Sequence, residues 1–170
     1  MIRLSYQRGV GLVEVLVAVL LLSVAVLGFS ALQLQAIKAT DESLVRTQAL
    51  SVVRGLAENM RANPLKMQAY QDAIKTPDES KAATCKELSE KCSSEQIAIK
   101  DANIAVKKLQ DYGITISMVT CPGTANFSEI KCLIAAWGNT KPEMSDDANA
   151  CATSTGVYKS GGTCVIVETY

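Results

Sequence analysis

A long stretch without charge near the N-terminus constrains this chain more than any other feature. Between Val10 and Ala36 the only charged side chain is Glu14. As a helix, the 23 residues of Val10–Leu32 would be about 34 Å long at 1.5 Å per residue, which is enough to cross a bilayer core. No proline interrupts the stretch, and a helix satisfies every backbone polar group inside lipid. The sequence therefore predicts a membrane-spanning helix.

The residues that flank this stretch predict its orientation. Arg3 and Arg8 stand immediately before it, and positive charge is typical of the cytoplasmic side of a membrane helix. We therefore expect the N-terminus in the cytoplasm and the rest of the chain on the other side of the membrane. A secretory signal cut near Gly28 or Ala31 is the alternative, but the apolar stretch is longer than a usual signal core.

The cysteines lie entirely beyond this helix. Their number is even and no pair has the Cys-x-x-Cys spacing of a metal site, which indicates disulfides formed in an oxidising compartment. The six residues are Cys85, Cys92, Cys121, Cys132, Cys151 and Cys164.

Composition argues against catalysis and against nucleic-acid binding. The chain has no histidine, which excludes Ser-His-Asp and Cys-His chemistry and histidine-containing zinc sites. Lys plus Arg equals Asp plus Glu at 17 each, and aromatic residues are only 5%, so no basic groove or stacking surface is expected. We predict a protein that is not an enzyme and that carries no cofactor and no metal.

A short motif at the start of the apolar stretch is more specific. Arg8-Gly9-Val10-Gly11-Leu12-Val13-Glu14, followed by VLVA, resembles the class III signal of type IV prepilins and pseudopilins. The longer stretch GVGLVEVLVAVLLLSVAVLGFSALQLQA is especially similar to the type IV pilus modification protein group called PilV. Major pilins usually begin with phenylalanine followed by a Thr-Leu or Ser-Leu pair, so Val10-Gly11-Leu12 in that place favours a minor pilin.

The resemblance implies how this end of the chain is processed. A prepilin peptidase would cut between Gly9 and Val10 on the cytoplasmic side and methylate Val10. Glu14 would then pair with the N-terminal ammonium of a neighbouring subunit and set its register, since a buried pair contributes more to register than to stability.

The implied function is a minor pilin that helps prime assembly of the type IV pilus and is incorporated into it. The implied partners are the prepilin peptidase, other minor pilins, the major pilin, the inner-membrane assembly platform, and membrane lipid before assembly. A minor pseudopilin of a type II secretion system shares the same signal and remains an alternative. A signal-anchored periplasmic binding or adhesion module, which would keep residues 1–9, is an alternative of another class.

Beyond the apolar stretch the pattern becomes amphipathic. The residues Val45, Ala49, Val52, Leu56 and Met60 follow helical spacing and predict one buried face. Asn63-Pro64 ends the pattern, which gives a single expected helix of 52 residues, Val10–Arg61. The expected organisation is a leader (1–9), a transmembrane and assembly helix (10–36), an amphipathic continuation (37–63) and a head outside the membrane (64–170).

The remaining chain predicts a small α+β head. A short helix is expected within Leu65–Ser80. Ser93 and Gln96 suit a capping box at the start of a second helix, which Gly113 would terminate. The expected inner face of that helix comprises Ile97, Ala98, Ala102, Ala105 and Leu109. Alternating patterns predict three antiparallel strands at Ile114–Thr120, Ile130–Trp137 and Thr163–Thr169, with an extended loop over Gly138–Gly162. With the long helix, this is a pilin-like α+β fold with disulfide-stapled loops.

Six cysteines allow fifteen pairings, and the strand predictions favour a sequential one. Cys121 and Cys132 flank the first hairpin, and Cys151 and Cys164 would close the loop before the last strand. Cys85 and Cys92 would remain as the third pair. Seven residues apart on one helix, their Cα atoms would lie about 10 Å from each other, beyond disulfide reach, so any helix there must end before Cys92.

Overall fold

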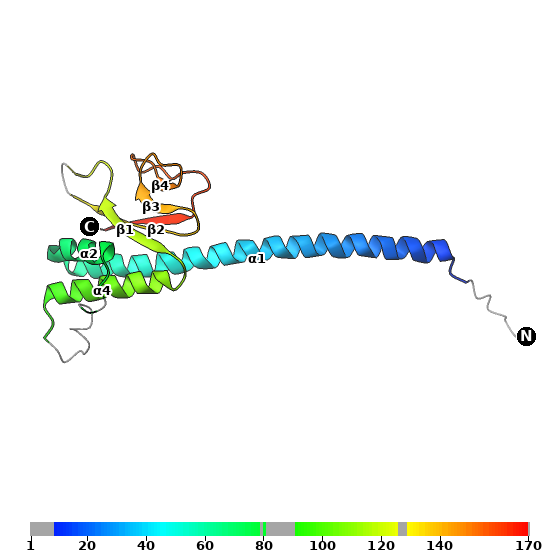
Figure 1. Cartoon of the computed structure of the whole chain (residues 1–170), viewed down its shortest axis with the longest axis horizontal. Helices are drawn as coiled ribbons and strands as arrows, with labels where there is room; N and C mark the ends of the chain where they lie inside the picture. The colour runs from blue at the N-terminus through cyan, green and yellow to red at the C-terminus, as the bar shows by residue number, and fades with distance from the viewer. Residues whose placement is uncertain (1–8, 79, 81–90, 126–128, 170) are drawn as a thin grey trace, which may run out of the picture. The chain divides into compact units, whose positions relative to one another are not determined.

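The computed structural model describes residues 9–78, 80, 91–125 and 129–169 (Figure 1). The chain divides into two units, Met1–Ser43 and Leu44–Tyr170. Helix α1 (Leu12–Ala62) contributes to both and contains 51 residues. The expected helix began two residues earlier, at Val10. Instead, Gly9, Val10 and Gly11 are not helical. The first backbone hydrogen bond of the helix is donated by Glu14 N to Gly11 O at 3.0 Å.

Residues 44–62 of α1 supply one face of the core of the second unit. The buried positions are Ala49, Val53, Leu56, Ala57 and Met60. Three of these match the expected face. Val45 and Val52 are only partly buried, because the centre of the buried stripe lies at Val53, next to the predicted Val52.

The helix ends at Ala62, one residue after the predicted end at Arg61 and still before Asn63-Pro64. Asn63 precedes a 3-10 turn, Pro64–Lys66, and a short helix α2, Met67–Lys75. Pro64 cannot donate a helical hydrogen bond, which ends the helix. The Asn63 side chain donates from Nδ2 to Ser94 O at 2.7 Å.

Helix α4 (Ser94–Gln110) begins with the predicted capping box. Gln96 N donates to Ser93 Oγ at 3.2 Å, and Ser93 N donates to Gln96 Oε1 at 2.8 Å. Gly113 follows the helix with φ at 68°, a conformation that favours glycine. The expected inner position Ile97 is wrong, because its side chain is 41% exposed. The residues that face the core are Ala98, Ala102, Asn103, Ala105, Val106 and Leu109.

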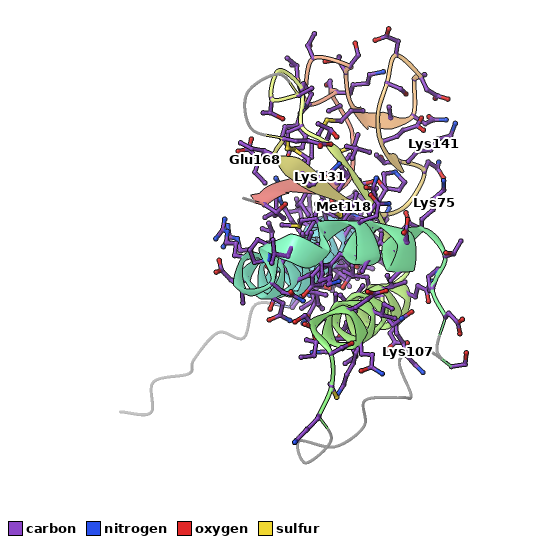
Figure 2. All side chains as sticks on the ribbon, turned by 90° about the vertical axis from the view of Figure 1, so that its left-hand side faces the viewer. Lys75, Lys107, Met118, Lys131, Lys141 and Glu168 are labelled. Atoms are coloured by element: carbon purple, nitrogen blue, oxygen red, sulfur yellow. A yellow bond between two sulfur atoms is a disulfide. The ribbon has the colours of Figure 1, made fainter. Side chains whose placement is uncertain are left out.

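A three-stranded antiparallel sheet lies against these helices. Its strands are β1 (Thr115–Thr120), β2 (Lys131–Ala136) and β5 (Cys164–Thr169), in the order β1-β2-β5. Side chains alternate between its faces. Leu133, Ala135 and Val165 belong to the core shared with the helices, whereas Ile134 and Ala136 pack in a second cluster. Figure 2 shows the helices below the sheet and the β3–β4 region above it.

That β3–β4 region replaces part of the loop expected over Gly138–Gly162. β3 (Lys141–Met144) and β4 (Ala150–Ala152) pair in parallel. Ser145 N donates to Ala152 O at 3.0 Å, and Lys141 N donates to Asn149 O at 2.7 Å. The excursion covers the outer face of the sheet, where Cys151 and Met144 pack against Ile134.

A buried tyrosine makes the stability of this unit sensitive to alkaline pH. The Tyr70 side chain is 0% exposed, and its hydroxyl lies 3.4 Å from Asp101 Oδ2. Burial, and then the neighbouring Asp101 carboxylate, raise the pKa of Tyr70 to about 12 from the usual value of 10.0. The folded state therefore holds this proton more tightly than the unfolded state.

We expect the contribution of Tyr70 to stability to be complete below pH 10 and to be lost as the pH rises towards 12. A difference of this size corresponds to about 2–3 kcal/mol. Denaturant unfolding at a series of pH values would measure it, with Tyr70→Phe as the control that has no such proton. If both proteins lose the same free energy of unfolding across this range, the shifted titration is not coupled to folding.

Candidate functional site

The candidate site lies at the N-terminal end of α1, in the first unit. Gly9 and Val10 are exposed and not helical, and Val10 is 72% exposed. Glu14 lies in the first turn of α1, where the helix dipole favours a negative charge. Val10 and Glu14 line one shallow depression together with Val15, Ala18, Val19 and Leu22. The three residues predicted to be cut, methylated and paired are thus close together along one short segment.

The surface of the helix that follows is apolar, as expected of a segment that lies in an apolar environment. Its large side chains are exposed, including Leu16 at 61%, Leu20 at 63% and Leu27 at 71%. By length and composition, this part of α1 is capable of crossing a membrane. Nothing within the described residues covers it, so in water these side chains would be a strong driving force for association.

The hydroxyl groups on this apolar surface are satisfied within the helix. Ser23 Oγ donates to Val19 O at 2.7 Å, Ser30 Oγ to Val26 O at 2.9 Å, and Thr40 Oγ1 to Ala36 O at 2.9 Å. Such bonds to the preceding turn let hydroxyls enter lipid without an unmet hydrogen bond. Glu14 differs, because its carboxylate has no hydrogen bond or ion pair with any residue that the structure describes. It is the only charged group between Val10 and Ala36, so in an apolar environment it has the greatest need of a partner from elsewhere.

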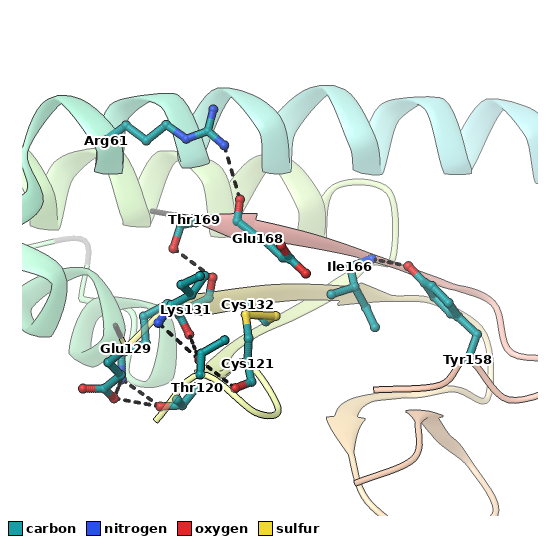
Figure 3. The surroundings of a disulfide bond; sticks show 12 residues. Arg61, Thr120, Cys121, Glu129, Lys131, Cys132, Tyr158, Ile166, Glu168 and Thr169 are labelled. Atoms are coloured by element: carbon teal, nitrogen blue, oxygen red, sulfur yellow. Dashed lines mark hydrogen bonds and ion pairs between the residues drawn. A yellow bond between two sulfur atoms is a disulfide. The ribbon is translucent and has the colours of Figure 1, made fainter. Parts of the chain in front are cut away.

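Two of the expected disulfides are formed in the second unit. Cys121 and Cys132 are bonded across the β1–β2 hairpin, with Cα atoms 5.1 Å apart (Figure 3). Cys151 and Cys164 join β4 to β5, with Cα atoms 5.8 Å apart. Cys92 is disulfide-bonded, whereas Cys85 lies outside the described residues, so the pairing of Cys85 with Cys92 stays a prediction. Residues 85–90, where any helix was expected to end before Cys92, also lie outside them.

The two described disulfides therefore staple the head. Cys132, Cys151 and Cys164 are buried, and among the described residues no cluster of acidic or cysteine side chains is arranged to hold a metal. Sequence reasoning missed two contacts at the edge of the sheet, in which Tyr158 and Arg61 bond to the backbone of β5. No local pattern in the sequence indicates either contact.

Two family models match the chain. The prokaryotic N-terminal methylation motif matches residues 4–30, and the Tt1218-like family, described as type IV pilin Tt1218, matches residues 31–103. No curated protein and no solved structure gives a significant match. The two models meet end to end along α1 and continue into the head. Together they support a place in the type IV pilin superfamily, and neither bears on the PilV-type subgroup.

Proposed function

We propose that this chain, whose family matches support a place among the type IV pilins, is a minor pilin that helps prime pilus assembly and is incorporated into the pilus. It acts by contacts between subunits and not by catalysis. The observation that carries the proposal is the methylation motif at residues 4–30 directly joined to an apolar helix whose surface is left uncovered. Packing against the same kind of helix in neighbouring subunits would cover that surface.

Processing would begin at the exposed, non-helical segment that precedes α1. A prepilin peptidase would cut between Gly9 and Val10 and methylate Val10. Before assembly the chain would be a single-pass protein of the inner membrane, with its N-terminus in the cytoplasm and its head on the other side. After assembly it would be part of the extracellular pilus, in contact with other minor pilins, the major pilin and the assembly platform.

The start of the mature chain favours a minor subunit of the PilV kind. Val10-Gly11-Leu12 stands where major pilins usually carry phenylalanine and a Thr-Leu or Ser-Leu pair. The head, with its disulfides and its long excursion between β2 and β5, favours a pilus over a type II secretion pseudopilus. Copurification with sheared pili, as opposed to secretion components, separates these two functions.

The mass and N-terminal sequence of the protein test the proposal directly. In cells with an active prepilin peptidase we expect a chain that lacks residues 1–9 and begins at N-methylated Val10. In cells without the peptidase we expect the full chain from Met1. A chain that begins at Met1 in both strains, or that is cut near Ala31, would contradict the proposal and favour an anchored or secreted disulfide domain.

A further inference from the structure

The outer edge of β5 presents an incomplete set of hydrogen bonds. β5 pairs only with β2 in the three-stranded sheet. Ile166 N donates outward to the Tyr158 hydroxyl at 2.9 Å, and two residues further on Glu168 O accepts from the Arg61 guanidinium at 3.5 Å (Figure 3). In an antiparallel pair, alternate residues turn their backbone groups away from the partner strand. Ile166 and Glu168 are therefore the outward-facing residues.

Between these two contacts lie two further backbone groups, Ile166 C=O and Glu168 N–H. No partner for either is found among the described residues. Both groups lie on the same edge. Val167 stands between them, and its backbone N–H and C=O point towards β2. One residue of a parallel neighbouring strand has the geometry to donate to the first and accept from the second. The next two main-chain bonds of such a strand would be made to Ile166 N and Glu168 O, so a longer strand would displace the Tyr158 hydroxyl and the Arg61 guanidinium from them.

A cavity of about 490 Å³ opens beside this edge, on the face of the sheet away from the helices. Its lining combines apolar groups, namely the Cys121–Cys132 disulfide, Met144 and Ile166, with Tyr158 and the Glu168 carboxylate. Glu168 forms no ion pair with any residue that the structure describes. Figure 3 shows its carboxylate near the disulfide.

The position and lining of the cavity indicate which side chain of an added strand it would bind. Alternate side chains of an added strand point to the same face as Ile166 and Glu168, so one of them would lie in the cavity. A Lys or Arg side chain fits its chemistry, because the aliphatic stem packs on apolar groups while the charged end meets a carboxylate.

We propose that the β5 edge and this cavity bind an extended segment of a partner protein, added parallel to β5, with a basic side chain against Glu168. Strand addition of this kind takes its affinity from main-chain bonds and its specificity from pockets for alternate side chains. A protected edge is the simpler reading, since natural sheets block edges with side chains. In the free protein the exposed Glu168 carboxylate and the two central backbone groups can bond to water, so the proposal rests on the fit of a basic side chain to the cavity lining. The proposal does not depend on incorporation into a pilus.

A synthetic peptide tests the site on the full chain in detergent micelles. The probe is the capped heptapeptide Thr-Val-Thr-Lys-Thr-Val-Thr, which places Val, Lys and Val on one face of a strand. The matched probe has norleucine in place of Lys and keeps the stem without the charge. We expect saturable shifts in the amide resonances of Val167 and Glu168, and about two- to fivefold weaker binding of the norleucine peptide, the range of a partly exposed ion pair.

Variants of the protein complete the test. Glu168→Gln should abolish the preference for the Lys peptide while the norleucine peptide binds as before. Asp146→Asn removes an exposed carboxylate outside the cavity lining and should leave the preference intact. Equal binding of both peptides, shifts confined to the helices, or no saturable shift at β5 would each overturn the proposal. Self-association of the chain through β5 without peptide would favour a second copy as the occupant and would also overturn it.

Discussion

Glu14→Ala is expected to reduce incorporation of the protein into pili at least tenfold. Glu14 is the only charged side chain between Val10 and Ala36, and the described part of the chain offers it no partner. In a bundle of apolar helices its carboxylate would pair with the N-terminal ammonium of a neighbouring subunit, which is free only after cleavage. Removing one member of a buried pair leaves the other charge uncompensated, at a cost of about 3–5 kcal/mol. Quantifying the protein in sheared pili against its level in the membrane measures the effect.

The helix itself supplies the control for this experiment. Ser23→Ala removes a polar group from the same surface, but the Ser23 hydroxyl already bonds to Val19 O at 2.7 Å. We therefore expect Ser23→Ala to be incorporated normally. Both variants should still be cut after Gly9, which separates a loss of assembly from a loss of processing. Normal incorporation of Glu14→Ala would show that this carboxylate merely tolerates its position at the start of the helix.

Features that depend on neighbours along the chain could be predicted from the sequence. The capping box of Ser93 and Gln96 needs residues only three apart, and Pro64 acts on the residue before it. β1 was visible from the alternation of its side chains, whereas β2 is buried on both faces and was visible as a short apolar run. The observed bounds of the three main strands differ from the predicted ones by one residue at several ends.

Features that depend on distant parts of the chain could not be predicted from the sequence. β3 and β4 are only four and three residues long. They pair in parallel within an excursion whose position is fixed by Cys151–Cys164 and by packing on Ile134. Ile97 was expected on the inner face together with Ala98 and Ala102, yet the two alanines are buried while Ile97 is 41% exposed. Small residues at these positions let the helix approach closely, which a simple count of apolar residues does not reveal.

The candidate assembly site shows a different limit. Gly9, Val10 and Glu14 could be selected from a local motif, and the structure brings all three to one end of α1. The partners that we propose for them belong to other molecules, so neither periodicity nor the fold of one chain would supply them. The β5 edge is the opposite case, because Tyr158, Arg61 and Glu168 come from separate segments and only the folded structure brings them together.

Leu133→Ala is expected to destabilise the head by about 2–5 kcal/mol. Leu133 lies in the central strand β2, is 0% exposed and contacts the core shared with α1, α2 and α4. The change removes buried apolar surface and leaves a cavity that strands paired on both sides cannot easily close. Leu65→Ala is the matched control, because Leu65 is 92% exposed on the Pro64–Lys66 turn and its loss should cost little. The single tryptophan, Trp137, is 8% exposed in the same core, so its fluorescence during denaturant unfolding reports the head directly. If the two variants unfold at the same denaturant concentration, the sheet–helix core is not what stabilises this unit, and the disulfides must hold it instead.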